Sequence, residues 1–182
     1  MFIQALLLPL LATLAIASPV TPRTPEGNFI RSVANPNLYV TVQYGYAAPG
    51  TLVAMTGGQM KQFQFFSVAD PQQGQIKLIS DETMCLDADT SNGNGGKVTV
   101  ETCEDGKDSQ VFTVAPTPGN PGYSRYAIGL AQAQCLDVVK DSVPIGRKPY
   151  GSEKDLQTWE CHPANHPDAQ QQYFDLVAPV SN

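Results

Sequence analysis

The sequence predicts an all-β domain, and three observations support that fold class. The 182 residues include 15 Gly and 15 Pro, which interrupt helices and favour turns. The β-branched and aromatic residues fall in short runs between these turn residues, as expected of short strands. A segment of the form Q-x-F-x-[VL] occurs three times, which indicates an internal repeat. Long helices are therefore not expected.

The N-terminal segment predicts a secretory signal peptide over residues 1–17. Its apolar run is too short to span a bilayer and ends in the A-x-A cleavage pattern of Ala15, Ile16 and Ala17. Residues 18–27 contain three prolines and no hydrophobic periodicity, so we expect an extended linker there. The mature protein is therefore predicted to be secreted and extracellular, with its folded domain over residues 28–178.

The charge balance argues against two classes of partner. With 11 Lys and Arg against 17 Asp and Glu, the formal net charge is −6. Nucleic acids and anionic membrane surfaces are bound by clustered Lys and Arg, so neither is an expected partner of this acidic chain. No second apolar run follows the leader, so membrane insertion is not expected. A domain of about 150 residues buries enough surface to fold alone, and a monomer is expected.

Two motifs define the internal repeat. The three Q-x-F copies begin at Gln64, Gln110 and Gln172, at spacings of 46 and 62 residues. A C-L-D motif with a further cysteine downstream precedes the last two copies, beginning at Cys85 and at Cys135. These landmarks predict three repeats, over about residues 28–69, 70–116 and 117–178.

Four β-rich runs fall in each repeat, so the sequence predicts twelve short strands. They cover residues 28–33, 38–43, 51–55 and 63–68, then 75–79, 84–87, 97–103 and 110–114, then 123–130, 134–139, 156–161 and 172–177. Three repeats stacked in an open solenoid would leave both end faces exposed, whereas a barrel capped by hairpins has no open edge. The predicted architecture is therefore a β-trefoil with pseudo-threefold repeats. The Phe of each motif would enter the shared core, and its Gln would bind backbone groups.

Four cysteines in a secreted chain predict two disulfides. Pairing Cys85 with Cys103 and Cys135 with Cys161 closes loops of 18 and 26 positions within single repeats. Each such loop would stabilise the fold by roughly 3 kcal/mol. Two other pairings are possible, but they would link different repeats and leave the repeated pattern unexplained.

With these motifs, residues 28–178 resemble the ricin B-type lectin family, and the third repeat is the most similar part. In that family a repeat binds a galactose-type sugar through the Asp of C-L-D, a Q-x-W-x-C segment whose ring stacks on the sugar, and a polar pair before the last strand. The resemblance implies a noncovalent site for galactose or N-acetylgalactosamine glycans. The residues in the matching positions are Asp137, Gln157, Trp159, Gln171 and Gln172.

The chemistry of these residue types fits a sugar. A carboxylate accepts two hydroxyl hydrogen bonds, an indole face covers the apolar C–H patch of a pyranose, and amides complete the hydroxyl pattern. Gln171 stands where the family usually has Asn, and its longer side chain would shift the contact to the sugar.

The other repeats depart further from the family pattern. The second keeps Asp87 but has Thr99 and Glu101 in place of the Gln and Trp. It has no stacking platform, and only a weak second site is expected there. The first repeat has Thr41 near the Asp position and Met55 near the Trp position, so no site is expected. The lectin should then be effectively monovalent.

No metal, cofactor or catalytic centre is expected. His162 and His166 lie next to Cys161, but no C-x-x-C accompanies them and the cysteine is assigned to a disulfide. No G-x-S-x-G is present, and with all cysteines in disulfides no thiolate remains as a nucleophile.

An alternative function from another class is a β-trefoil protease inhibitor without sugar binding. It would present a loop such as residues 141–154, where Arg147 and Lys148 suit a trypsin-like pocket. Pro149 directly after Lys148 argues against a substrate-like loop, and the matched residues of the third repeat favour the lectin.

Overall fold

A computed structural model describes residues 28–57, 65–67, 73–91, 93–117, 125–143, 145–146, 151 and 153–178. The predicted signal peptide and linker, residues 1–27, lie outside the described residues. Thirteen strands and four short 3-10 turns occur in the described part of the chain. The strands are β1 (Asn28–Ser32), β2 (Leu38–Val42), β3 (Thr51–Gly57), β4 (Phe65–Ser67), β5 (Gln73–Gly74), β6 (Lys77–Leu78), β7 (Asp81–Ala88), β8 (Gly96–Thr102), β9 (Phe112–Pro116), β10 (Arg125–Gly129), β11 (Gln134–Val138), β12 (Glu153–Glu160) and β13 (Tyr173–Val177). The 3-10 turns are η1 (Gln43–Gly45), η3 (Asp108–Gln110), η4 (Ala131–Ala133) and η5 (Ala169–Gln172).

One ring of antiparallel strands forms a barrel. Strand β1 pairs with β4 and β13, β13 with β10, β10 with β9, β9 with β5, and β4 with β6. The prediction of one continuous strand at residues 75–79 is wrong. In the structure that strand position is split into β5 and β6, because the chain turns from one barrel neighbour to the other around the buried Ile76. The split closes the ring.

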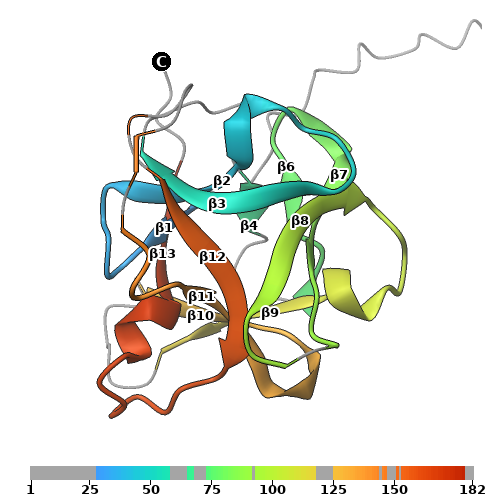
Figure 1. Ribbon diagram of the computed structural model, residues 1–182. Helices are drawn as coiled ribbons and strands as arrows, with labels where there is room; N and C mark the ends of the chain where they lie inside the picture. Colours follow the sequence, from blue (N-terminus) through green and yellow to red (C-terminus); the bar gives the residue numbers. More distant parts are fainter. Residues whose placement is uncertain are drawn as a thin grey trace, which may run out of the picture.

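Three hairpins cap the barrel, one from each repeat: β2–β3, β7–β8 and β11–β12. Their second strands also pair with one another, so that β3, β8 and β12 form a triangle on the face turned to the viewer in Figure 1. A barrel capped by three equivalent hairpins is the β-trefoil predicted from the sequence. Gly96, where β8 begins against β12, is required there, because a Cβ would lie 1.8 Å from the Asp89 carbonyl oxygen.

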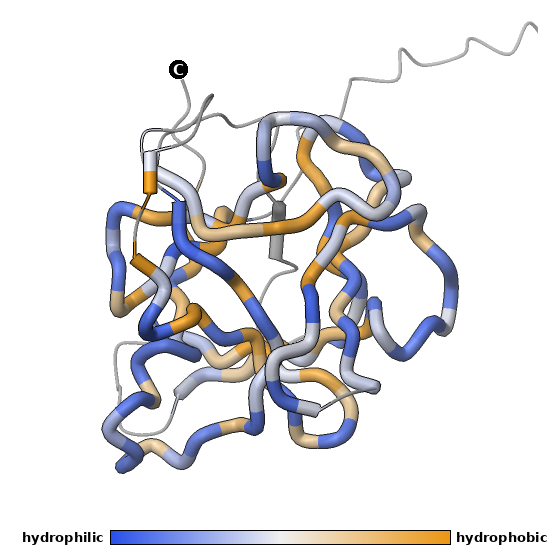
Figure 2. Tube along the Cα trace, in the orientation of Figure 1, coloured by the Kyte–Doolittle hydropathy of each residue, from blue (hydrophilic) through white to orange (hydrophobic). Residues whose placement is uncertain are grey.

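The core takes apolar side chains from all three repeats. Phe112 and Phe174, from the second and third Q-x-F motifs, are completely buried, as predicted. Figure 2 shows hydrophilic positions in the connecting loops and a mixture of hydrophobic and hydrophilic positions along the strands, as in β12. Gln64 of the first copy lies outside the described residues.

Two disulfides join Cys85 to Cys103 and Cys135 to Cys161. The pairing within repeats is therefore confirmed. No helix among the described residues is long and apolar enough to cross a membrane.

The glutamines of the second and third motifs hold these disulfides in the same way. Gln110 donates to the carbonyl of the residue before Cys103 and accepts from the N–H of the residue after it, at 3.0 and 2.8 Å. Gln172 makes the same two bonds around Cys161, at 2.9 and 2.8 Å. Both glutamines end a 3-10 turn rather than begin a strand, because their side chains point inward to reach this backbone.

Candidate functional site

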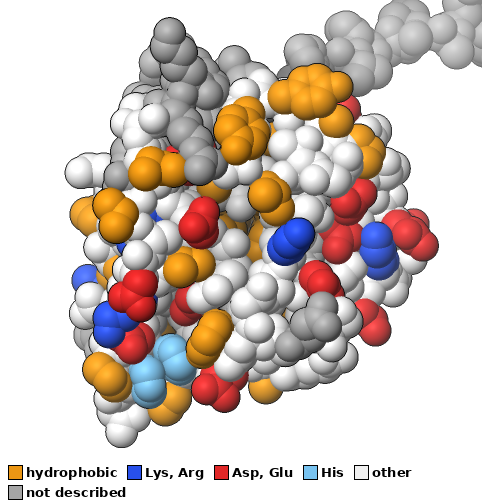
Figure 3. Space-filling view, viewed as in Figure 1, with side chains coloured by type: hydrophobic (Ala, Val, Ile, Leu, Met, Phe, Trp, Pro, Cys, Tyr) orange, Lys and Arg blue, Asp and Glu red, His pale blue; other side chains and the backbone are white. Residues whose placement is uncertain are grey.

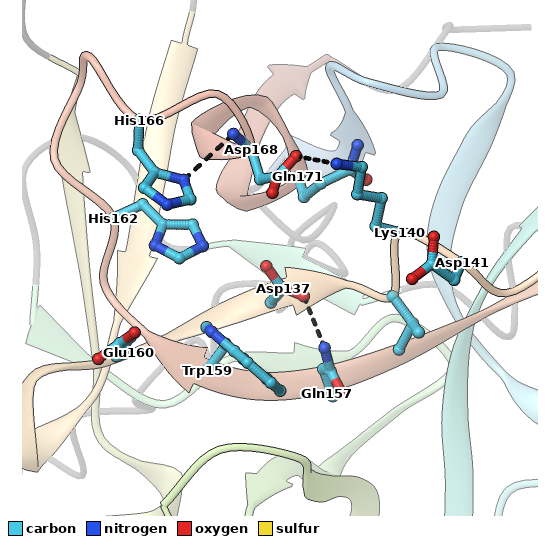
Figure 4. Close-up of a pocket in the computed structure, with 11 residues that line it drawn as sticks. Asp137, Lys140, Asp141, Gln157, Trp159, Glu160, His162, His166, Asp168 and Gln171 are labelled. Carbon is cyan, nitrogen blue, oxygen red and sulfur yellow. Dashed lines mark hydrogen bonds and ion pairs between the residues drawn. The ribbon is translucent and has the colours of Figure 1, made fainter.

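A cavity of about 470 Å³ opens on the outer side of the β11–β12 hairpin in the third repeat (Figure 4). Nine of its eleven lining residues have polar or charged side chains, and one indole ring lies on the floor. The residues that line it are Asp137, Val139, Lys140, Asp141, Gln157, Trp159, Glu160, His162, His166, Asp168 and Gln171.

The floor of the cavity carries a carboxylate and an amide that face each other across two strands. Asp137 on β11 is directly opposite Gln157 on β12, and Nε2 of Gln157 donates to Oδ1 of Asp137 at 2.8 Å. Asp137 is only 5% exposed. Its burial raises the pKa of the carboxyl above 3.8, although hydrogen bonds from Gln157 and Gln172 act in the opposite direction.

Trp159 lies two residues further along β12, on the same face as Gln157. The residues between and beside them, Thr158 and Leu156, are buried on the other face, as the strand period of two requires. Trp159 is half-buried and takes no part in the hydrophobic core. Its indole lies beside Asp137 in Figure 4. Because the core does not use this ring, a ligand in the cavity can contact it.

The two remaining predicted site residues have different places. Gln171 lines the cavity, and its amide oxygen is buried without a hydrogen-bond partner among the described residues. Gln172 is 2% exposed and lies behind the cavity, where it bonds to the backbone of Glu160 and His162 and to the Asp137 carboxylate. Four of the five predicted residues therefore line the cavity, and Gln172 supports it from beneath.

Sequence reasoning missed the wall opposite Trp159. Nζ of Lys140 lies 2.6 Å from Oδ1 of Asp168, and the rings of His162 and His166 stack with centroids 3.8 Å apart. The hydrogen bond from Lys140 lowers the pKa of Asp168 below 3.8.

The sequence does contain a signal for this wall. Eleven positions separate Cys161 from Gln172, but only seven separate Cys103 from Gln110. The four additional positions lengthen the segment that carries both histidines and Asp168.

The equivalent place in the second repeat is filled by the protein itself. The Asp87 carboxylate lies 2.9 Å from Nζ of Lys107 and 3.0 Å from Nε2 of Gln110. Thr99 is directly opposite Asp87, and Glu101 is opposite Cys85, where the third repeat has Trp159.

The first repeat has no carboxylate at this place. Thr41 occupies the position of Asp137 and pairs with Ala54. Met55, expected near the Trp position, is one residue before it. Met55 pairs with Val40 and is buried in the core, while Thr56, opposite Tyr39, occupies the position of Trp159.

Two further expectations concern the same part of the chain. Within the described residues, no three His, Cys, Asp or Glu side chains converge on a possible metal position. The loop considered for protease inhibition is described only in part: Arg147, Lys148 and Pro149 lie outside the described residues.

Comparison with known protein families shows which family the chain belongs to. Residues 28–159 match the family described as "Ricin-type beta-trefoil lectin domain". The chain belongs to this family. No curated protein matches the sequence of this lectin domain.

Solved structures show the same fold as the lectin domain. It is similar to the designed threefold-symmetric protein ThreeFoil, with a TM-score of 0.61, 13% identity and coverage of 84% of this chain and 98% of that one. It is also similar to the C-terminal half of an earthworm R-type lectin solved with GalNAc, with a TM-score of 0.53, 14% identity and coverage of 84% and 99%. A third similar structure is an exo-β-1,3-galactanase from Clostridium thermocellum, with a TM-score of 0.60, 16% identity and coverage of 85% and 30%.

Proposed function

We propose that this protein is a secreted lectin that binds galactose-type glycans noncovalently, one per chain, in the cavity of its third repeat. The observation that carries the proposal is the floor of that cavity. The hydrogen-bonded Asp137 and Gln157 lie beside an indole that the core does not use. This combination supplies hydroxyl acceptors and donors next to a flat apolar face, as a pyranose requires.

Gln171 adds a further polar group. Its buried amide oxygen has no hydrogen-bond partner among the described residues, and an unpaired buried acceptor costs about 1–3 kcal/mol. When the sugar binds, a hydroxyl that donates a hydrogen bond to this oxygen would remove the cost of the unpaired acceptor. This role suits the longer side chain at a position where the family usually has Asn.

The galactose class is supported by the family and by the names of two similar proteins. The earthworm lectin was solved with GalNAc, and the Clostridium protein is an exo-β-1,3-galactanase. The present chain corresponds to 30% of the galactanase chain. We propose binding without catalysis for this chain, because all four cysteines are in disulfides and no nucleophile with a neighbouring base was recognised in the sequence.

Calorimetric titration tests the proposal. The purified protein is titrated with galactose, N-acetylgalactosamine and lactose, with mannose as a control of equal size. We expect saturable binding of at least one galactose-type sugar at one site per chain, and no binding of mannose. A glycan array then ranks the sugars and linkages. Failure of every galactose-type sugar in both assays would contradict the proposal.

A further inference from the structure

A second cavity, of about 230 Å³, lies where the three hairpins meet. The pairs in this triangle are related by the pseudo-threefold repeat: Leu52 is opposite Thr99, Lys97 is opposite Gln157, and Asp155 is opposite Ala54. Leu52, Lys97 and Asp155 are therefore equivalent positions on β3, β8 and β12, and all three line the cavity. We call it the apex cavity.

The three equivalent positions carry three different chemistries. Lys97 is a cation, Asp155 an anion and Leu52 an apolar residue that is 40% exposed. The side chains of Lys97 and Asp155 are exposed, and neither takes part in an ion pair among the described residues. Gly95, with φ of +83°, also lines the cavity, and no atom lies within 4 Å of a Cβ built there.

The apex cavity adjoins the site of the third repeat. Val139 and Gln157 line both cavities, and Val139 is held to β12 by a hydrogen bond from its N–H to the Asp155 carbonyl, at 3.0 Å. Both cavities lie along β12. Figure 3 shows charged and apolar side chains interspersed over this face, with the two histidines in pale blue near its lower edge.

We infer that the two cavities form one groove, and that the ligand is a neutral oligosaccharide rather than a single sugar. This inference rests on the proposed function. The terminal residue occupies the cavity over Asp137 and Trp159, and the chain crosses Val139 and Gln157. The adjoining residue then enters the apex cavity, where Asp155 accepts and Lys97 donates hydrogen bonds to its hydroxyls, and Leu52 contacts its C–H face. A neutral ligand fits because the charges of Lys97 and Asp155 cancel, so that neither an acidic nor a cationic sugar gains a net attraction in this cavity.

The experiment compares ligand lengths in three proteins. Calorimetry measures Kd for galactose and for β-1,3- and β-1,4-linked galactobiose and galactotriose. The test protein is the double variant Lys97→Met, Asp155→Asn. The control, Arg125→Gln with Asp105→Asn, makes the same charge changes at exposed residues that line neither cavity.

We expect the wild type and the control to bind at least one oligosaccharide about tenfold more tightly than galactose, the gain of one or two additional hydrogen bonds. The test variant should lose this gain and keep the galactose Kd unchanged. Galactose binding without any gain from length would overturn the groove and leave the proposed function intact. A gain that survives in the test variant would overturn the apex cavity as the second subsite. If neither galactose nor any oligomer binds, the proposed function fails and the groove fails with it.

Discussion

The ammonium group of Lys107 lies 2.9 Å from Oδ2 of Asp87, the carboxylate equivalent to Asp137 of the third repeat. Lys107 precedes Gln110 by three positions, and the residue three positions before Gln172 is the buried Ala169. The second repeat therefore carries its own cation at the place where the third repeat has an open cavity. With Thr99 and Glu101 in place of Gln157 and Trp159, it also offers no aromatic ring.

This difference predicts opposite results for the same substitution in the two repeats. Asp137→Asn should abolish sugar binding, because an amide cannot accept two hydroxyl bonds and retain its bond to Gln157. Asp87→Asn should leave Kd and the stoichiometry of one unchanged. Calorimetric titration of both variants with the best array sugar checks this. A stoichiometry of two in the wild type, falling to one in Asp87→Asn, would show that the second repeat binds.

Sugar affinity should fall with acidification at a higher pH than an ordinary aspartate would cause. Burial raises the pKa of Asp137 above 3.8, and the protonated carboxyl has less acceptor capacity for the two sugar hydroxyls than the carboxylate has. Calorimetric titrations at decreasing pH measure the pH at which half of the sugar affinity is lost. This midpoint should lie above 3.8. A midpoint below 3.8 would exclude Asp137 as the controlling group.

Unfolding can be separated from this effect by its sign. Because the folded-state pKa of Asp137 is raised, its contribution to the free energy of unfolding increases as the pH falls through that pKa toward 3.8. The pKa of Asp168 is lowered in the folded state. Its contribution to the free energy of unfolding is therefore kept above pH 3.8 and lost as the pH falls below that value. Near-UV circular dichroism should therefore show a folded protein at the pH where affinity is lost.

The two equivalent glutamines should matter equally for stability and differently for binding. Gln172→Ala and Gln110→Ala each remove two partly buried hydrogen bonds to the backbone, at a cost of about 0.5–1.5 kcal/mol per bond in the free energy of unfolding. Only Gln172→Ala should weaken sugar binding, since Gln172 holds the backbone around Cys161 and bonds to Asp137. Urea unfolding and calorimetry measure the two effects. Equal loss of binding in both variants would mean that the loss follows from stability alone.

Much of the fold could be predicted because the determinants are local and repeated. The Q-x-F and C-L-D motifs mark strand ends and disulfides, and the structure confirms the trefoil, both pairings and the buried Phe112 and Phe174. The strand at 75–79 was predicted as one piece because its division depends on two barrel neighbours that are distant in sequence.

The candidate site divides in the same way. Asp137, Gln157 and Trp159 could be predicted from the family resemblance, because the C-L-D and Q-x-W-x-C motifs are short and fall on the two strands of one hairpin. The longer spacing between Cys161 and Gln172 indicates an extended segment beside the site. It does not identify Lys140, His162 and Asp168, because an ion pair and a ring stack between loop residues leave no periodic pattern in the sequence.

Replacement of the single tryptophan tests the central claim most directly. Calorimetry with the best array sugar and thermal unfolding are both measured for Trp159→Ala. The account predicts that sugar binding is lost while the melting temperature stays close to that of the wild type, because the indole lies outside the core. A core tryptophan would instead cost about 3–5 kcal/mol and lower the melting temperature without any sugar present. A stable Trp159→Ala variant that binds as tightly as the wild type would contradict the account.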